Sequence, residues 1–125
     1  MLIRIECFCD PIPLARPRFS GRRAYLPERS RRYREILQAD VRAQLPADFV
    51  PFEEDDLICR LKFYRKFRPS SRRFGDIDNL SKAALDAAQG IIFADDAKII
   101  SLSAEKFQDE RPRTEILFET KKAGL

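Results

Sequence analysis

The sequence predicts a single α/β domain in which helices pack on one layer of mixed sheet. The length of 125 residues suits one domain with one core. Stretches of alternating apolar residues indicate strands, and two other stretches have apolar residues at helical spacing. Prolines, glycines and charge-rich segments separate these stretches. The resulting order is β-α-β-α-β-β across residues 1–125, with no internal repeat.

The N-terminal half is expected to supply one strand, a basic loop and one helix. Alternation across about 2–9 indicates a strand, so the N-terminus is interpreted as part of the fold and not as a signal peptide. Residues 14–28, rich in Pro, Gly and Arg, are expected to form a loop or an extended hairpin. Apolar side chains then recur every three or four residues from 29 to 45, which predicts a helix that ends at Pro46.

The C-terminal half is expected to supply three strands and a second helix. Residues 57–65 alternate and predict a strand, and 78–89 have the apolar face of a helix. Two further alternating segments, 99–104 and 114–119, predict the last strands. Because only a turn at 109–112 separates them, we expect these two strands to close the sheet as a hairpin.

The composition excludes several kinds of site. The chain has no histidine, which removes Cys/His zinc sites, the Ser-His-Asp triad and a histidine general base. Its three cysteines, Cys7, Cys9 and Cys59, are expected to be reduced core thiols of a cytoplasmic protein. No apolar run approaches the roughly 20 residues that a membrane span requires. Catalysis would therefore use carboxylates, Lys, Tyr, Ser or a metal ion.

Basic residues are concentrated in two windows of the chain. Residues 16–34 carry eight arginines and one acid, and residues 60–73 carry seven Lys or Arg and no acid. Together they hold fifteen of the 24 basic residues, although the net charge is only +4. Such segregation is typical of a protein that binds a polyanion, because a merely solvated surface usually mixes both signs.

Four carboxylates form an acidic island inside this basic background: Asp76, Asp78, Asp95 and Asp96. Asp76 and Asp78 are one residue apart, and in an extended segment they would project to the same side. Two carboxylates about 5 Å apart repel by roughly 3 kcal/mol at an effective dielectric of 20. Bound Mg²⁺ would relieve this repulsion and supply phosphodiester chemistry, with Mn²⁺ able to substitute. Acids gathered at a helix N-terminus by the helix dipole are the alternative.

The helix between the two acid pairs raises a geometric question. A helix of about twelve residues spans about 18 Å. The pairs therefore meet only if residues 90–94 fold back towards the start of the helix. Lys82 shares a helical face with Asp78 and Asp86, so it is either a group that stabilises charge at the scissile phosphate or a partner in a helical salt bridge. Asp86 is interpreted as a surface partner.

Two sequence segments resemble the signature of the RusA endonucleases, which are Holliday-junction resolvases of bacteria and prophages. These segments are DIDNLSKAALDA at 76–87 and FADDAKII at 93–100. The length and element order also resemble those of the family. The proline- and arginine-rich segment near the N-terminus resembles phage-type members, although the two basic windows do not align residue by residue.

This resemblance implies a site and a reaction. Asp76, Asp78 and Asp96 correspond to the family's three Mg²⁺-coordinating carboxylates, and Lys82 corresponds to its functional lysine. Asp95 corresponds to the acid beside the third ligand. The resemblance implies a homodimer that cuts four-way junctions symmetrically. A two-fold dimer would also place two acidic sites on a two-fold junction.

The expected function is Mg²⁺-dependent resolution of Holliday junctions by paired nicks, in DNA recombination and repair. A non-catalytic nucleic-acid-binding module, or a nuclease for flaps or forks, are the alternatives. Phe67 and Phe74 are expected either to wedge against bases at a branch point or to pack, beneath the loop or in the dimer contact. The arginines expected to grip the DNA backbone are Arg16, Arg18, Arg22, Arg23, Arg72 and Arg73.

Overall fold

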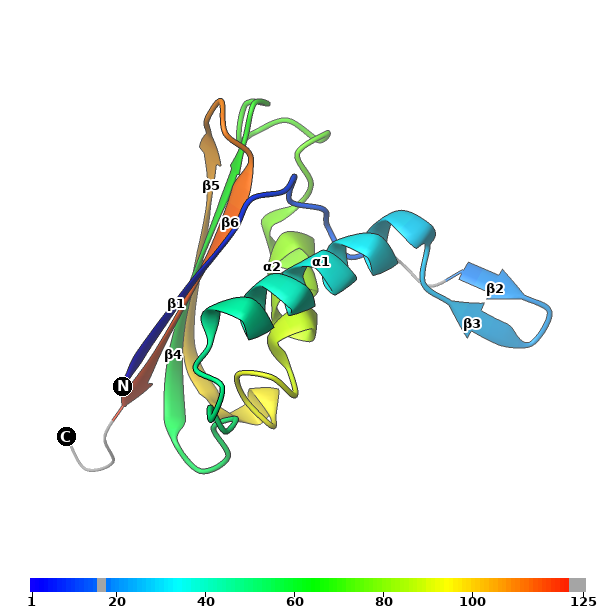
Figure 1. Ribbon diagram of the computed structural model, residues 1–125. Helices are drawn as coiled ribbons and strands as arrows, with labels where there is room; N and C mark the ends of the chain where they lie inside the picture. The colour runs from blue at the N-terminus through cyan, green and yellow to red at the C-terminus, as the bar shows by residue number, and fades with distance from the viewer. Residues whose placement is uncertain (16–17, 122–125) are drawn as a thin grey trace.

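The computed structural model describes residues 1–15 and 18–121 (Figure 1). Arg16, one of the expected DNA contacts, lies outside these residues, and so does the side chain of Arg18. A four-stranded mixed sheet carries two helices on one face, and a small hairpin projects from one end. The elements are β1 (Leu2–Cys7), β2 (Arg18–Ser20), β3 (Arg23–Tyr25), α1 (Glu28–Gln44), β4 (Asp56–Arg65), α2 (Ile77–Ala88), the 3₁₀ turn η1 (Asp96–Lys98), β5 (Ile99–Gln108) and β6 (Arg113–Lys121). The predicted fold class is confirmed.

The strand order is β1-β6-β4-β5, which corrects one expectation. Strands β5 and β6 do not form a hairpin, because β4 lies between them. Helix α2 connects β4 to β5 as a parallel crossover, and this connection places β5 on one side of β4. Strand β6 then pairs antiparallel with β1 and with the other side of β4. The turn after β5 therefore crosses the end of β4, where the Asp109 N–H donates to the Arg65 carbonyl at 2.8 Å.

The core lies between the sheet and the two helices. Strand β4 alternates as predicted, and the side chains at 57, 59, 61 and 63 are almost fully buried. Helix α2 turns small residues towards the sheet, including Ala84 and Ala88, which lets the helix approach closely. The other face of the sheet is open and carries mixed charges. Neither helix in the described part of the chain is long and apolar enough to cross a bilayer.

The basic segment before α1 forms the hairpin that its composition suggested. Strands β2 and β3 pair with Phe19 opposite Ala24, and Gly21 closes the turn with a positive φ of 62°. The side chain of Phe19 is 72% exposed. An isolated two-stranded hairpin has little stability of its own. We therefore regard β2–β3 as an arm that presents side chains and adds nothing to the core.

Raising the pH above 9 is expected to destabilise the fold through Cys59. This thiol is fully buried, and burial raises its pKa from the ordinary value of 9.0 to about 12. Below pH 9 both the folded and the unfolded state keep the proton, so the stability is fully present there. Between pH 9 and 12 only the unfolded state loses it, and the free energy of unfolding should fall by about 1.4 kcal/mol per pH unit.

Urea denaturation of the wild type and of Cys59→Val, at pH 8.0 and again about two units higher, measures this effect. The variant keeps a buried apolar side chain at this position but removes the ionisable group. Its stability should therefore decline less with pH than that of the wild type. Equal declines in the two proteins would show that ionisation of Cys59 contributes nothing.

Candidate metal centre and nucleic-acid surface

The start of α2 is fixed by an unusually close contact with the segment that follows β1. Gly75 has a φ of +102°, and a Cβ at this position would lie 2.9 Å from Cγ of Pro13. Only glycine fits this backbone and this contact without strain. Beyond it, the Leu14 N–H donates to the Asn79 carbonyl at 3.0 Å. The segment around Pro13 is thereby held against the first turn of α2.

Asp76 and Asp78 both lie exposed at this end of α2. Asp76 is the N-cap residue and has extended backbone angles, but its carboxylate makes no capping hydrogen bond within the described chain. Asp78 is not in an extended segment as expected, because the helix already begins at Ile77. One oxygen of Asp78 accepts from the Asn79 N–H at 2.9 Å. Both residues therefore retain carboxylate oxygens that face solvent, as a hard divalent cation requires.

A surface hollow of about 410 Å³ is lined by Asp76 and by a basic residue. The basic residue is Arg72, which comes from the loop before α2. The remaining lining residues are Pro13, Leu14, Ala15, Gly75 and Asn79. A carboxylate and a guanidinium in one open hollow can hold a metal ion and a phosphate side by side. This is the part of the predicted site that the structure assembles.

Asp95 and Asp96 lie at the other end of α2, in and just before η1 (Figure 1). The segment 90–94 does not fold back along the helix. Gly90, with a φ of +84°, donates its N–H to the Phe93 carbonyl at 2.7 Å. Phe52 then holds the segment in place, because its N–H donates to the Ile92 carbonyl and its carbonyl accepts from the Ala94 N–H, both at 2.9 Å.

The four predicted carboxylates therefore form two separate pairs in one chain. Within the described residues, no three acidic or cysteine side chains lie close enough together to hold a metal ion. Asp95 is also engaged locally, since its Oδ1 accepts from the Ala97 N–H at 3.0 Å and so caps η1. Asp96 follows as the first residue of η1 and is exposed. The two pairs are separated by the length of α2, about 18 Å for twelve residues.

Two lysines are relevant to the site. Lys82 is exposed on α2, and it forms no ion pair within 4.0 Å among the described residues, so the helical salt bridge is not found. Lys106, on β5, was not predicted. Its Nζ donates to the Gly75 carbonyl at 2.9 Å and lies 5.4 Å from the centre of the Phe74 ring. Nothing in the local sequence signals this contact, because thirty-one residues separate Lys106 from Gly75.

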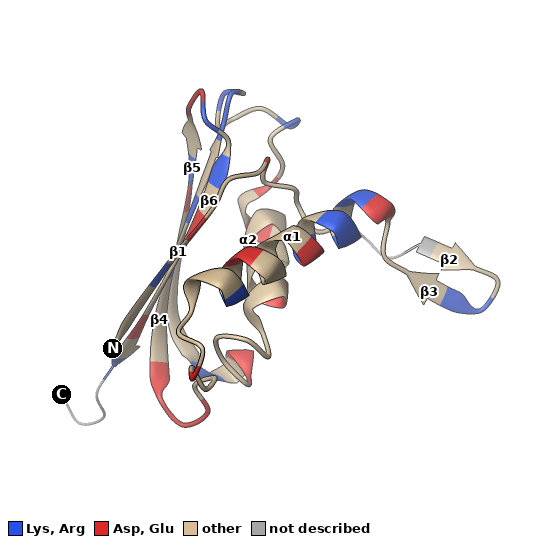
Figure 2. Cartoon of the chain, viewed as in Figure 1, with Lys and Arg blue, Asp and Glu red and all other residues tan. Residues whose placement is uncertain are grey.

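The two basic windows do not form one uniform surface. The hairpin turn, the first turns of α1 and the loop before α2 carry exposed arginines (Figure 2). Arg22, Arg23, Arg72 and Arg73 all belong to this exposed set. In contrast, Arg60 and Lys62 alternate with the buried side chains of β4 and lie on the open face of the sheet. There they line a groove together with Arg4 and Glu115.

The loop after β4 shows different roles for its two phenylalanines. Phe74 is fully buried in the core, so packing is the correct interpretation of this residue, and the wedge is excluded for it. Phe67 is 39% exposed, and the guanidinium of Arg65 lies 5.0 Å from its ring centre. Arg65 also donates to the Arg73 carbonyl at 3.2 Å. Arg65 therefore shapes the loop, while Phe67 and Arg73 remain accessible at its surface.

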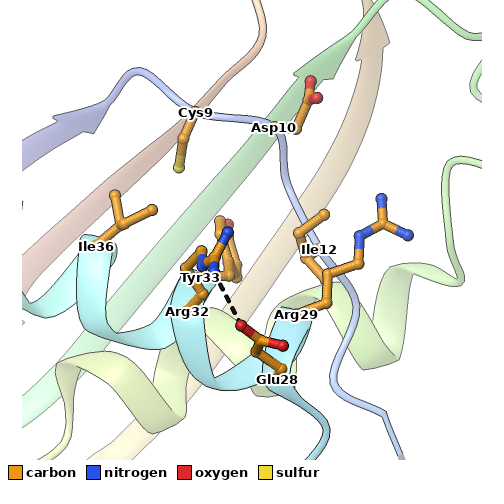
Figure 3. A pocket seen from close by; sticks show the side chains of 8 residues that line it. All are labelled: Cys9, Asp10, Ile12, Glu28, Arg29, Arg32, Tyr33 and Ile36. Carbon is orange, nitrogen blue, oxygen red and sulfur yellow. Dashed lines mark hydrogen bonds and ion pairs between the residues drawn. The ribbon is translucent and has the colours of Figure 1, made fainter.

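A second hollow, of about 460 Å³, lies between α1 and the segment after β1 (Figure 3). Its two acids are already paired, Glu28 with Arg32 at 2.9 Å and Asp10 with Arg65 at 3.8 Å. Cys9 lines the hollow and is only half-buried, which differs from the expected core position. All three cysteines are free thiols. Because its acids have partners, this hollow is a poor metal site.

Comparisons with known proteins give the family of the chain. The sequence model of the family described as Endodeoxyribonuclease RusA matches residues 9–119. The chain is also 36% identical over 50 residues to a protein of Bacillus subtilis (strain 168) named Uncharacterized protein YqaN. That match covers 40% of this chain and 34% of the relative, so the chain spans about a third of the relative's length. Since the family match covers most of its length, the chain belongs to the RusA family of endodeoxyribonucleases.

Proposed function

We propose that this chain is a Mg²⁺-dependent endonuclease that resolves four-way DNA junctions by paired, symmetric nicks. The observation that carries the proposal is the hollow at the start of α2, which is lined both by Arg72 and by Asp76, whose carboxylate makes no capping hydrogen bond. In an endodeoxyribonuclease family, such a pair suits a phosphodiester and a divalent cation. The work would take place on DNA in the cytoplasm, during recombination, repair or phage DNA processing.

The proposed metal-binding residues are Asp76 and Asp78 at the start of α2 and Asp96, with Asp95 as a weaker candidate, beyond its other end; a single described chain does not bring the two pairs together. Their carboxylate oxygens are the ligands that Mg²⁺ and Mn²⁺ prefer. When bound, such an ion polarises the phosphoryl oxygen and lowers the pKa of an attacking water. Lys82, exposed and without an ion-pair partner in the described chain, would place positive charge beside the scissile phosphate.

The exposed arginines would hold the DNA backbone without reading its sequence. Arg72 and Arg73 lie directly before the acidic residues, and Arg22 and Arg23 lie in the hairpin arm. Contacts of this type go to phosphates and position the nucleic acid. Arg16 and Arg18 are proposed as further contacts on the same charge argument. A homodimer would bring two such surfaces to the two-fold arms of a junction.

A synthetic immobile four-way junction tests the function. Each strand is end-labelled in turn and incubated with the purified protein in Mg²⁺ or in EDTA, beside a linear duplex of equal length. Paired nicks at symmetric positions on opposite strands, dependent on Mg²⁺ and absent from the duplex, are expected. Tight binding with no cutting in Mg²⁺ or Mn²⁺ would support the non-catalytic module instead. Flap and fork substrates in the same assay test the remaining alternative, a nuclease for other branched DNA. Cutting of flaps or forks without cutting of the four-way junction would support it.

Removing Arg72 and Arg73 together is expected to weaken junction binding and its dependence on salt. Each lost phosphate contact should reduce the magnitude of the slope of log K against log salt concentration by roughly 0.9. The slope of the double alanine variant should therefore be smaller than that of the wild type by roughly 1.8. Fluorescence anisotropy of a labelled junction at several salt concentrations measures the slope.

The matched control is the double variant Arg60→Ala and Lys62→Ala. It removes the same charge from the open face of the sheet, and its slope should stay close to that of the wild type. Equal losses in both double variants would mean that net charge governs binding, and that the loop before α2 is not a specific contact.

A further inference from the structure

Two thiols lie in contact where β1 ends. Cys7 is the last residue of this strand, and its Sγ lies 3.3 Å from Sγ of Cys9. Both residues are free thiols, and no step of the proposed nuclease reaction uses them. We propose that Cys7 and Cys9 form a reversible oxidation site, which reacts with a hydroperoxide and closes to a disulfide within the chain. This site is independent of the proposed function.

The two thiols differ in their access to solvent. Cys7 is fully buried in a cluster with Tyr33 and Leu37 of α1. Cys9 is half-buried and lines the hollow of about 460 Å³ beside α1, with its sulfur pointing towards that helix (Figure 3). A small hydroperoxide that enters this hollow therefore meets Cys9 first. Access makes Cys9 the thiol that attacks the peroxide and Cys7 the thiol that closes the disulfide.

The contact between the two sulfurs also favours the thiolate of Cys9. A hydrogen bond from the Cys7 S–H lowers the pKa of Cys9 below its ordinary value, although burial and the carboxylates of Asp40 and Asp10 oppose this effect. The same hydrogen bond, together with burial, raises the pKa of Cys7, so Cys7 keeps its proton. Since the thiolate is the nucleophilic form of cysteine, Cys9 is the more reactive member of the pair.

Cys59 provides a comparison within the same chain. It is fully buried in the core, and burial raises its pKa to about 12. A buried thiol that keeps its proton is a poor nucleophile. We therefore expect Cys59 to react slowly with the peroxide that oxidises the pair.

The reaction needs one hydroperoxide, either hydrogen peroxide or an alkyl hydroperoxide. The Cys9 thiolate attacks one peroxide oxygen, the O–O bond breaks, and the other oxygen takes a proton and leaves as water or an alcohol. Cys9 is then a sulfenic acid. The sulfur of Cys7 attacks the sulfur of Cys9, and the displaced hydroxide takes the Cys7 proton and leaves as water. In total, two thiols lose two electrons and two protons, and the hydroperoxide is reduced to two hydroxyl compounds.

The disulfide requires only a small movement. Its two sulfurs lie about 2.05 Å apart, so the thiols must approach each other by roughly 1.3 Å. Cys7 is held in place, because it is fully buried and pairs with Thr114 on β6. Cys9 lies beyond the end of the strand, in a bend, and is only half-buried. Cys9 is therefore the residue that moves when the bond forms.

Oxidation of the purified, reduced chain with one equivalent of hydrogen peroxide tests the site. The remaining thiols are alkylated, and digestion with trypsin leaves Cys7 and Cys9 together in the fragment 5–18. We expect this fragment to lose two hydrogen atoms and both alkylation sites, at a rate at least about ten times that of Cys59. Dithiothreitol should restore both thiols. In urea, where the fold is absent, the advantage over Cys59 should largely disappear.

Several results of this experiment would overturn the proposal. The site is wrong if both thiols stay free, if the fragment 5–18 only gains oxygen atoms, or if the new disulfide joins two chains on a non-reducing gel. It is also wrong if the pair in the folded chain reacts no faster than Cys59.

Single substitutions separate the roles of the two thiols. Cys9→Ser should leave Cys7 reduced. Cys7→Ser should stop the reaction at the sulfenic acid of Cys9, which dimedone captures as a stable adduct. Cys7→Ala should give the same adduct, and its small apolar side chain suits the buried position if serine disturbs the fold. Cys59→Val, the matched control, should react like the wild type. Oxidation of Cys7 in Cys9→Ser at the wild-type rate would overturn the assignment of Cys9 as the attacking thiol.

Discussion

Replacing Asp76 with Asn is expected to abolish strand cleavage and to leave junction binding intact. The side chain is exposed, and it has no capping hydrogen bond within the described residues. The substitution therefore costs little folding free energy, but it removes a charged oxygen ligand from the proposed metal site. A loss on the order of 10³-fold or more in the cleavage rate, or about 4 kcal/mol, is expected. Single-turnover cleavage and anisotropy on the same labelled junction measure the two properties.

Asp86→Asn is the matched control, because it removes an exposed carboxylate from the same helix, nearly three turns further along. It should cut at nearly the wild-type rate. The metal-site assignment would be in difficulty if Asp76→Asn lost binding as completely as cleavage while its circular dichroism spectrum and its thermal midpoint stayed unchanged. If Asp76→Asn also cut at nearly the wild-type rate, Asp76 would have no part in the mechanism.

Replacing Phe93 with Ala is expected to cost about 3–5 kcal/mol of unfolding free energy. The ring is fully buried, and its centre lies 5.4 Å from that of Phe118 on β6. The backbone of Phe93 also pairs with Phe52 and Gln89, so this residue anchors the segment between α2 and η1. Domains of this size have only about 5–15 kcal/mol in total, and the variant should be close to unfolding. Urea denaturation followed by circular dichroism measures the loss.

Phe67→Ala provides the comparison, since its ring is 39% exposed and lies on Arg65. It should lose less than about 1 kcal/mol. A cost for Phe93→Ala as small as that of Phe67→Ala would show that the loop before η1 repacks around the missing ring, and that Asp95 and Asp96 are not held rigidly.

Local patterns predicted the elements, because strand alternation and helical spacing are properties of neighbouring residues. The helix expected over 29–45 is α1, and the strand expected over 57–65 is β4. The place of β5 was not predictable in this way. The short turn between β5 and β6 favoured a hairpin of these two strands. Instead, the crossover through α2 makes β4 the neighbour of β5. This connection involves residues from β4 to β5, so no local pattern indicates it.

In the candidate site, too, the features set by neighbouring residues could be predicted, and those set by distant contacts could not. The presence of Asp76 and Arg72 in one hollow could be predicted, because the two residues are only four positions apart in the sequence. The position of Asp96 depends on Phe52, which lies more than forty residues earlier and leaves no signal in the acidic segment itself. The role of Lys106 could not be predicted for the same reason. Its contact with Gly75 joins a residue of β5 to a loop that lies thirty-one positions earlier in the sequence.

The amide of Gln44, the last residue of α1, covers part of the sheet edge at β1. The Glu6 N–H donates to Oε1 of Gln44 at 3.0 Å, and Nε2 of Gln44 donates to the Glu6 carbonyl at 2.7 Å. An unpaired sheet edge is a template on which another strand can add. Because the outward backbone groups of Glu6 are already bonded, a strand that adds at this point of β1 must first displace the Gln44 amide.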